Sequence, residues 1–267
     1  MVVENKAGAA GTIGASQVAK ATADGYTLMW TGNGPLTLSP FLYPSAHYDP
    51  AKSFVPIGIG AMSSYVLAVS STANFTTLEG LVAEGKRREA SRTLTYASNG
   101  QNGSLHLLAL LLAAKSGMKA LHVPYKGGAS GVTALLAGEV DFTFDAVSTA
   151  LPFIRSGKLR ALAITGSKRD PALPTVPTLG ESGMPSLTFD VFYGLLAPAG
   201  TPQPVVEKLA MAMQRAVADP EIQKAIKATG NVAQSRTPVE FGSMIGHEAS
   251  RWQSILREQG ISATAAQ

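Results

Sequence analysis

Cysteine is absent from the 267 residues of this chain, and charged side chains are scarce. Without cysteine there is no disulfide, no thiolate nucleophile and no cysteine-ligated zinc or iron–sulfur centre. Asp, Glu, Lys and Arg make up 15% of the residues, against about a quarter in an average domain. No apolar run reaches the roughly 18 residues that a membrane-spanning helix needs. With 45% hydrophobic residues, the composition indicates a well-buried globular protein and argues against disorder.

Positive charges are dispersed along the chain and form no stripe. The net charge is +4, and the densest basic run, Lys86–Arg88, lies between Glu84 and Glu89. Nucleic-acid binding needs clustered cations and stacking aromatic rings, so this run indicates a solvated helix end and we expect no nucleic-acid partner. Residues Met1–Asn5 lead directly into a strand-like segment with no signal peptide, which fits a truncated start or numbering that begins inside a longer precursor.

The stretch Tyr96–His106, Y-A-S-N-G-Q-N-G-S-L-H, carries the strongest local signal. Residues 94–97 are typical of a strand end, 98–103 of a Gly-rich polar turn, and an apolar helix is predicted from Ser104. Such a junction leaves backbone N–H groups unpaired at the positive end of the helix dipole, where a carboxylate or phosphate would be stabilised. An ordinary turn with Asn102 or Gly103 near the helix cap is the alternative interpretation.

A strand, a turn of small residues and a helix recur after Thr31, Ala97, Tyr125 and Phe144. This alternation predicts an α/β fold with mostly parallel sheets flanked by helices. Because ligands of parallel α/β sheets collect at the carboxyl ends of the strands, we expect several of these turns to converge on one ligand site.

Helices dominate the predicted C-terminal third of the chain. Thr237 and Glu240 have the spacing of a capping box, and Phe241, Ile245 and Trp252 follow at helical period. We expect this segment to supply packing and no chemistry.

Catalytic and metal-binding patterns are missing. No pair of the four histidines has the spacing of a metal site, and neither a nucleophile elbow nor a Walker A lysine occurs. Asp141 and Asp145 lie four residues apart on one strand, which separates them by more than about 10 Å, too far for a general acid/base pair. We therefore expect a binding protein, not an enzyme, and no cofactor or metal.

Three side chains near the turns have two interpretations each. Asp145, at a strand end, either accepts a hydrogen bond from a ligand or caps the helix predicted at Thr149. His106 either contacts a ligand or packs in the core. Lys126 is the one cation at a candidate turn, although lysines in turns are usually solvated.

Several short motifs occur in order along the chain. They are V-P-Y-K-G-G at 123–128, L-L-A-G-E-V-D at 135–141, F-D at 144–145, G-K-L-R-A-L-A at 157–163, P-T-V-P-T at 174–178 and Y-G-L-L-A-P-A-G-T-P at 193–202. Together they resemble the substrate-binding receptors of tripartite tricarboxylate transporters, the Bug family, over nearly the whole chain.

The resemblance implies a two-lobed, type II-like periplasmic-binding-protein fold that closes on a small carboxylate in the cleft between its lobes. Residues 1–71 with 187–267 would form lobe 1, and residues 72–186 would form lobe 2. It further implies a periplasmic location and delivery of the ligand to membrane permease subunits. The positions that match the family's ligand contacts are Gly32, Asn33, Gly34, Ser98, Asn99, Asn102, Gly103, Ser104, His106, Lys126, Gly127, Asp145, Ala146, Phe192 and Tyr193.

Two departures from the family pattern stand out. The strand–loop–helix unit that opens family members is missing before Val2, and with it one ligand-contacting loop. Pro35 and Leu36 stand where the family often has a Thr/Ser-His pair, so ligand preference is expected to differ. A sensor that signals to a partner protein is the alternative function for the same cleft.

Overall fold

A computed structural model describes residues 2–6, 8–43, 46–88, 92–258 and 260–261. The chain divides into two compact units, each built from separate segments. Unit 1 comprises residues 1–62, 192–227 and 232–267, and unit 2 comprises residues 63–191 and 228–231. Two strands carry the chain from one unit into the other, since β2 (Phe54–Ser63) ends and β8 (Val191–Pro198) begins at the boundary. None of the helices in the described ranges has the length and apolarity to cross a lipid bilayer.

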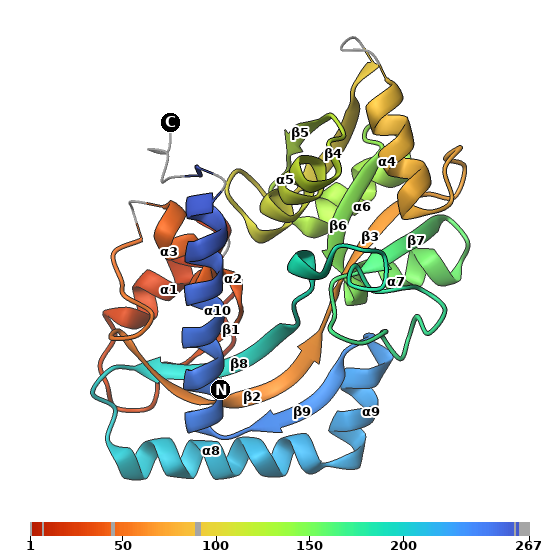
Figure 1. Ribbon diagram of the computed structural model, residues 1–267. Coiled ribbons are helices and arrows are strands. Elements are labelled where there is room, and N and C mark those ends of the chain that lie inside the picture. Colours follow the sequence, from red (N-terminus) through yellow and green to blue (C-terminus); the bar gives the residue numbers. More distant parts are fainter. Residues whose placement is uncertain (1, 7, 44–45, 89–91, 259, 262–267) are drawn as a thin grey trace. The chain divides into compact units, whose positions relative to one another are not determined.

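Unit 1 contains a four-stranded sheet in the order β1-β8-β2-β9 (Figure 1). Strand β1 (Met29–Gly32) runs antiparallel to β8, and β9 (Val232–Arg236) runs antiparallel to β2. The helical elements of this unit are η1 (Ala9–Gly11), α1 (Thr12–Ala19), α2 (Gly34–Thr37), α3 (Ser39–Leu42), α8 (Gln203–Ala218), α9 (Pro220–Ala228) and α10 (Pro238–Glu258).

The core of unit 1 forms where α10 and the early helices pack on the strands. Phe192 and Phe241 are fully buried and meet edge to face with their ring centroids 5.2 Å apart. The predicted capping box at the start of α10 is confirmed: Thr237 N–H donates to Glu240 Oε2 at 2.8 Å, and Glu240 N–H donates to Thr237 Oγ1 at 3.3 Å. These two bonds satisfy N–H groups that a helix start otherwise leaves unpaired.

Unit 2 contains a sheet in the order β5-β4-β6-β3-β7. The strands are β3 (Tyr65–Ser70), β4 (Leu94–Ser98), β5 (Ala120–Pro124), β6 (Phe142–Ala146) and β7 (Leu159–Ile164). Strand β4 is parallel to both β5 and β6, whereas β3 is antiparallel to β6 and β7. The α/β prediction is confirmed, but the expectation of mostly parallel sheets is corrected to mixed sheets. Strand β3 follows β2 after a single residue, with no helix between them. The sequence pattern therefore did not reveal that β3 runs antiparallel to its neighbours in the unit 2 sheet.

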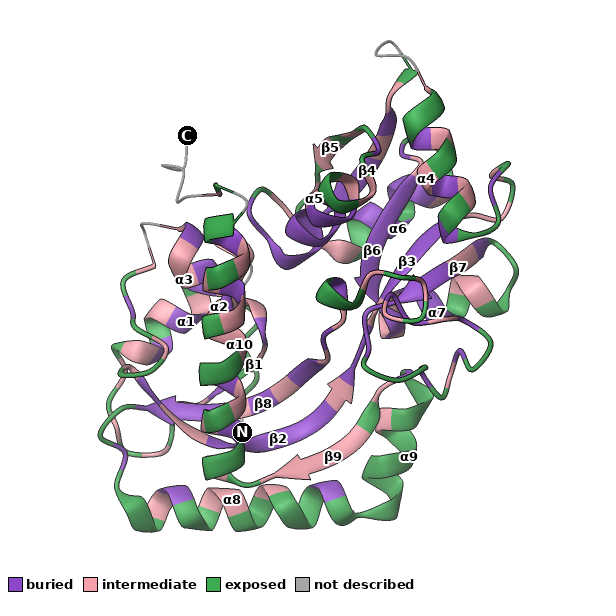
Figure 2. Ribbon diagram, in the orientation of Figure 1, coloured by how far each residue is buried: buried purple, intermediate pink, exposed green. Residues whose placement is uncertain are grey.

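In unit 2, a helix follows each of the parallel strands β4, β5 and β6, as the alternation predicted, and the first helix follows the antiparallel β3. The helices are α4 (Leu78–Arg87), α5 (Ser104–Ser116), α6 (Gly128–Ala137), α7 (Val147–Arg155) and the short η3 (Pro185–Leu187). Most residues of α5 are buried, including Leu105, Leu108 and Leu112 (Figure 2). A helix that is apolar on every side must be enclosed by other elements, which fixes the position of its N-terminus at the end of β4.

Candidate functional site

The turn between β4 and α5 is closed by its own side chains. Ser98 Oγ accepts the Gly100 N–H and donates to the Gly100 carbonyl oxygen, both at 3.1 Å. Asn99 lies against Gly103 so closely that a Cβ at Gly103 would come within 2.3 Å of Asn99 Oδ1. Asn102 has a φ of +58°, in the left-handed region that most side chains avoid. Asparagine is among the few non-glycine residues that accept this region, so the turn has one specific structure held by local side chains.

At the N-terminus of α5, backbone N–H groups precede the first intrahelical hydrogen bond. That bond runs from Leu107 N–H to the Gly103 carbonyl at 3.0 Å, so the amides of Ser104, Leu105 and His106 come before it. The first turn of α5 holds no acidic side chain. Ser104 Oγ lies 3.2 Å from the hydroxyl oxygen of Tyr65, at the start of β3. This helix end combines N–H donors with the positive end of a 13-residue dipole.

Two histidine side chains form hydrogen bonds with the turn. The ring of His106, from α5, and that of His122, from β5, have centroids 4.1 Å apart. Asn102 N–H donates to His106 Nδ1 at 3.1 Å, and His122 Nε2 lies 2.6 Å from Ser98 Oγ. Burial and then the neighbouring His122 lower the pKa of His106 to about 4, and burial lowers the pKa of His122. Both rings are neutral at pH 7 as a result.

The N-terminus of α6 differs from that of α5 because a carboxylate of the protein already occupies it. Asp145, at the end of β6, is 4% exposed, and its Oδ2 is buried without a hydrogen-bond partner. A Cβ at Gly128, the first residue of α6, would lie 2.4 Å from that oxygen. Asp145 Oδ1 accepts the Ala146 N–H at 2.7 Å. Burial raises the pKa of the Asp145 carboxyl to about 6, although bonds from Ala146 and Thr149 lower it.

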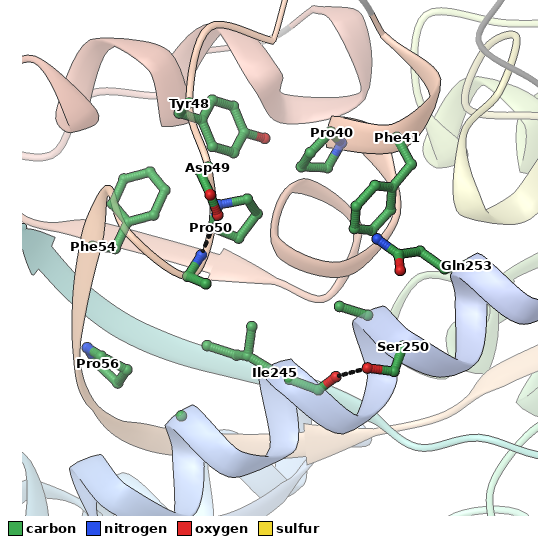
Figure 3. A pocket seen from close by; sticks show the side chains of 14 residues that line it. Pro40, Phe41, Tyr48, Asp49, Pro50, Phe54, Pro56, Ile245, Ser250 and Gln253 are labelled. Atoms are coloured by element: carbon green, nitrogen blue, oxygen red, sulfur yellow. Dashed lines mark hydrogen bonds between the residues drawn. The ribbon is translucent and has the colours of Figure 1, made fainter.

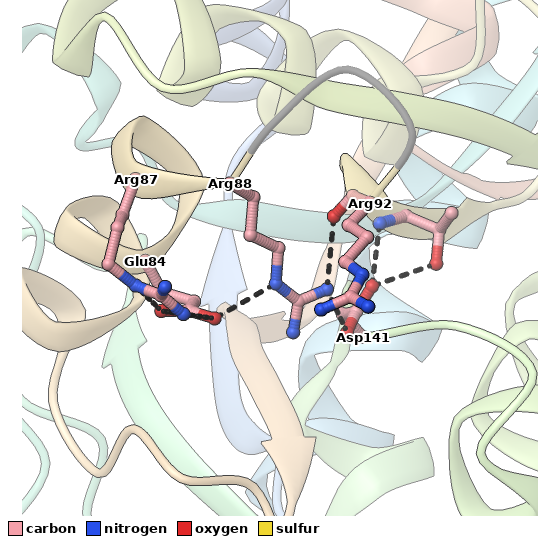
Figure 4. A network of polar contacts seen from close by, with 6 residues as sticks. Glu84, Arg87, Arg88, Arg92 and Asp141 are labelled. Atoms are coloured by element: carbon pink, nitrogen blue, oxygen red, sulfur yellow. Dashed lines mark hydrogen bonds and ion pairs between the residues drawn. The ribbon is translucent and has the colours of Figure 1, made fainter.

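The helix predicted at Thr149 begins at Val147, with Ala146 as its N-cap and no side-chain cap hydrogen bond, so Asp145 does not cap it. Thr149 bonds Asp145 through its side chain, and the ligand contact of Asp145 stays a prediction. Asp141, the second carboxylate of the motif, stabilises the fold (Figure 4). Its Oδ1 pairs with Arg88 at 3.2 Å, and its Oδ2 accepts both the Thr95 N–H at 2.8 Å and the Thr95 hydroxyl at 3.0 Å. Arg88 also pairs with Glu84 of α4 at 3.0 Å. Asp141 thus connects α4, β4 and β6.

Five predicted site residues belong to unit 1, and all but Gly34 meet at the pairing of β1 with β8. Gly32 is opposite Tyr193 in the register. Asn33 is buried, and its Oδ1 accepts the Phe192 N–H at 2.8 Å. The Phe192 ring belongs to the apolar core, so its side chain does not face solvent. Gly34 opens α2, a helix of only four residues.

The remaining predicted positions lie at the edges of the site in unit 2. Lys126 is exposed and Gly127 half-buried in the turn before α6, while Ala146 is buried at the end of β6. In the part of the chain that the structure describes, no group of three or more His, Asp or Glu side chains is arranged to hold a metal ion. The donors of the site are backbone amides and hydroxyls, which suit an anionic ligand better than a cation.

A pocket of about 630 Å³ lies in unit 1 between α10 and residues 40–41 and 48–56 (Figure 3). One wall carries apolar side chains such as Pro40, Phe41 and Phe54, and the opposite wall is α10 with the small residues Gly242 and Gly246. None of the predicted site residues lines it. The described residues of its lining are mostly apolar, with Asp49 as their one charged side chain, so pocket size alone does not locate the candidate site.

Three residues at the site were missed by the sequence analysis. His122, Tyr65 and Gly128 each contact a predicted residue: Ser98, Ser104 and Asp145, respectively. His122 belongs to a strand whose register against β4 the sequence does not reveal. A signal existed for Gly128, since it follows Gly127 in the turn predicted after a strand, where close backbone approach commonly requires glycine.

Comparisons with known sequences agree on one family. The family model "Tripartite tricarboxylate transporter family receptor" matches residues 1–261. A protein from the tcbD-tcbE intergenic region of Pseudomonas sp. strain P51 is 36% identical over 98% of this chain and 78% of its own length. BugT of Bordetella pertussis is 33% identical over 97% of this chain and 79% of its own length.

Solved structures agree with the family model. A periplasmic transporter has a TM-score of 0.92 at 38% identity and covers 98% of this chain and 87% of that one. An R. palustris protein with adipate has a TM-score of 0.91 at 29% identity and covers 99% and 88%. MatC from Rhodopseudomonas palustris with bound malate has a TM-score of 0.84 at 31% identity and covers 93% and 85%. The matched family is one of periplasmic solute-binding receptors rather than enzymes. This chain belongs to the receptor family of the tripartite tricarboxylate transporters, the Bug proteins.

Proposed function

We propose that this chain is an extracytoplasmic receptor that binds a small carboxylate at the N-terminus of α5 and delivers it to a tripartite tricarboxylate-type permease. The carboxylate would accept hydrogen bonds from the backbone amides of Ser104, Leu105 and His106. Lys126 and Gly127 would lie beside the ligand. Gly32, Asn33 and Tyr193 are the corresponding candidate contacts of unit 1.

The contrast between two neighbouring helix ends carries this proposal. Helices α5 and α6 follow the adjacent parallel strands β4 and β5. The end of α6 already has the buried Asp145 carboxylate against Gly128, whereas the first turn of α5 contains no acidic group. An anion at α6 would meet a negative charge, and an anion at α5 would meet only N–H donors and hydroxyls. The α5 end is therefore the one available to a ligand carboxylate.

Family relatives support carboxylates as the ligand class. One related structure contains adipate and another contains malate. Both molecules are small dicarboxylates, and binding through backbone N–H donors is compatible with either because amides recognise charge and shape and not one specific side group.

A ligand screen tests the proposed function. The purified chain would be heated with malate, adipate, citrate, benzoate and glutamate, each at several concentrations, and each hit would be titrated by calorimetry. A ligand that binds the folded state raises the melting temperature in proportion to the logarithm of its concentration once it exceeds Kd. Glycerol and inorganic sulfate at matched concentration control for excluded solutes and for non-specific anion effects. If no carboxylate raises the melting temperature above these controls, carboxylate binding is wrong for this panel.

Delivery to a permease needs a separate measurement. Membranes that contain the cognate permease subunits would be tested for carboxylate uptake with and without the purified receptor. Uptake that depends on the receptor would support delivery. Binding without any effect on uptake would contradict the transport role and would favour the alternative of a sensor.

A further inference from the structure

Two histidines hold the two ends of the turn between β4 and α5, which we call the binding turn (residues 98–103). His122 Nε2 lies 2.6 Å from Ser98 at its start, and His106 Nδ1 accepts the Asn102 N–H near its end at 3.1 Å. Asn102 is the residue with the left-handed φ of +58°. Asparagine adopts this conformation more readily than other non-glycine residues, and a bond to its backbone helps to hold it there. The hydrogen bond to His106 is such a bond.

The tautomer of His106 follows from this geometry. Because Nδ1 accepts a hydrogen bond it carries no proton, so the neutral ring has its proton on Nε2. A second proton can be added only at Nδ1, where it would point at the Asn102 N–H. Protonation therefore replaces a hydrogen bond with two opposed donors, and the bond to Asn102 cannot survive in the charged state.

Groups that face His106 add to the cost of a charge there. His122 from β5 has its ring centroid 4.1 Å away, and Tyr96 from β4 stacks at 6.2 Å. Burial raises the pKa of Tyr96 to about 12, so its hydroxyl stays neutral. From β6, Phe142 stacks on Tyr96, and η3, which contacts α5, consists of Pro185, Ser186 and Leu187. None of these side chains supplies a carboxylate to stabilise an imidazolium.

We propose that His106 is a positioning residue that holds the binding turn in its ligand-accepting form only while its ring is uncharged, with His122 holding Ser98 at the other end of the turn, so that acid releases the bound carboxylate. This inference rests on the proposed function for the identity of the ligand. The response of the turn itself to acid does not depend on any ligand.

Hydrogen exchange of the full chain without ligand tests the response of the turn. The exchange rate of the Asn102 amide would be measured by NMR from pH 7 to pH 3.5, relative to its intrinsic rate at each pH. We expect protection to fall at least tenfold in the native protein below about pH 4.5. His106→Asn keeps an acceptor at the position of Nδ1 but cannot be protonated, so its Asn102 amide should stay protected over the whole range.

Two further variants separate the local effect from general acid unfolding. His247→Gln changes an exposed histidine, 81% exposed in its side chain, and should behave as the native protein does. His122→Gln retains a group that can bond Ser98 but removes the second ring, so the loss of protection should move to higher pH because His106 is easier to charge. Unchanged protection in the native protein, or equal loss in His106→Asn, would overturn the inference.

Ligand affinity gives the second test, with malate and adipate as probes. The ratio of Kd values of the native protein and His106→Asn is compared at each pH, so that ionisation of the probe cancels. Each ratio is divided by its value at pH 7, which removes any direct effect of substituting this binding residue. With a pKa of about 4 for His106, we expect binding by the native protein to be about twofold weaker at pH 4 and about fourfold weaker at pH 3.5. Tighter binding by the native protein in acid would mean that the His106 imidazolium attracts the ligand, and would refute the inference. If neither probe binds at pH 7, the proposed function fails for these ligands. The exchange experiment, which uses no ligand, still shows whether the binding turn opens in acid.

Discussion

The carboxylate of Asp145 occupies the space that a side chain at position 128 would need. A Cβ at Gly128 would lie 2.4 Å from Asp145 Oδ2 and 2.6 Å from Oδ1, closer than non-bonded atoms approach. The backbone of Gly128 needs no unusual conformation, so the requirement for glycine is one of space. This contact joins the end of β6 to the start of α6. It places two of the short sequence motifs, V-P-Y-K-G-G at 123–128 and F-D at 144–145, against each other.

Gly128→Ala is expected to destabilise the protein by about 1–3 kcal/mol, the usual cost of forcing an extra carbon into a packed site. The buried carboxylate cannot move away without losing its bond to Ala146. Urea unfolding followed by circular dichroism would measure the change. Gly127→Ala is the matched control, because no heavy atom lies within 4 Å of a Cβ there and its backbone is extended. Equal stability of the two variants would show that the Asp145 contact is not tight.

Asp145→Asn is expected to stabilise the protein at neutral pH. The folded pKa of about 6 lies above the ordinary value of 3.8, so between these values the folded state binds more protons than the unfolded state. The contribution of Asp145 to stability is therefore present below pH 3.8 and is lost as the pH rises through 6. By linkage, the variant should exceed the native protein by about 2–3 kcal/mol at pH 7. That difference should vanish near pH 3.5.

Chemical denaturation at pH 7, 5 and 3.5 would measure this difference. A variant that is less stable than the native protein at pH 7 would mean that the ionised carboxylate makes bonds that outweigh its burial. Ligand titration of the same variant then separates the two roles of Asp145. If Asp145→Asn retains ligand affinity, Asp145 is not a ligand contact. If the variant is more stable but has lost affinity, Asp145 is a ligand contact.

Asp141→Asn is expected to lower stability by about 1 kcal/mol and to leave ligand affinity unchanged. The substitution removes the charge that pairs with Arg88 at 3.2 Å but preserves one oxygen for the Thr95 N–H. The loss should shrink in 1 M salt, because the partners are only about three-quarters buried. Glu221→Gln removes a fully solvated pair with Lys224 and serves as the control, with no measurable change expected. Weaker ligand binding by Asp141→Asn would place it in the site.

Local patterns predicted the elements of the site but not the contacts among them. The turn, the start of α5 at Ser104 and the capping box at Thr237 depend on residues close in sequence, so composition and spacing were sufficient. The bond of His122 to Ser98 depends on the register of β5 against β4, and Tyr65 reaches Ser104 from an antiparallel strand 39 residues earlier. No periodic pattern encodes such pairings. The burial of Phe192 was likewise hidden, because a long apolar strand does not reveal which face is enclosed.

Ser104→Pro tests the backbone donors at the N-terminus of α5. Proline at the first helical position is tolerated because that N–H has no partner within the helix, and Gly103 already has the extended conformation that a following proline needs, with φ −73° and ψ 161°. Ser104→Ala is the matched control, since both variants lose the hydroxyl contact with Tyr65 and only the proline removes the amide hydrogen.

The two variants should have similar stability, while Ser104→Pro should bind malate or adipate about 10- to 100-fold more weakly than Ser104→Ala. That ratio corresponds to one hydrogen bond to a charged group, about 1.5–3 kcal/mol. Calorimetric titration of both variants at pH 7 would measure it. Because a proline at this position leaves the side-chain donors of the neighbouring turn unchanged, equal affinities would show that the ligand does not accept the Ser104 N–H. The amides of Leu105 and His106 would then be the remaining donors at this helix end.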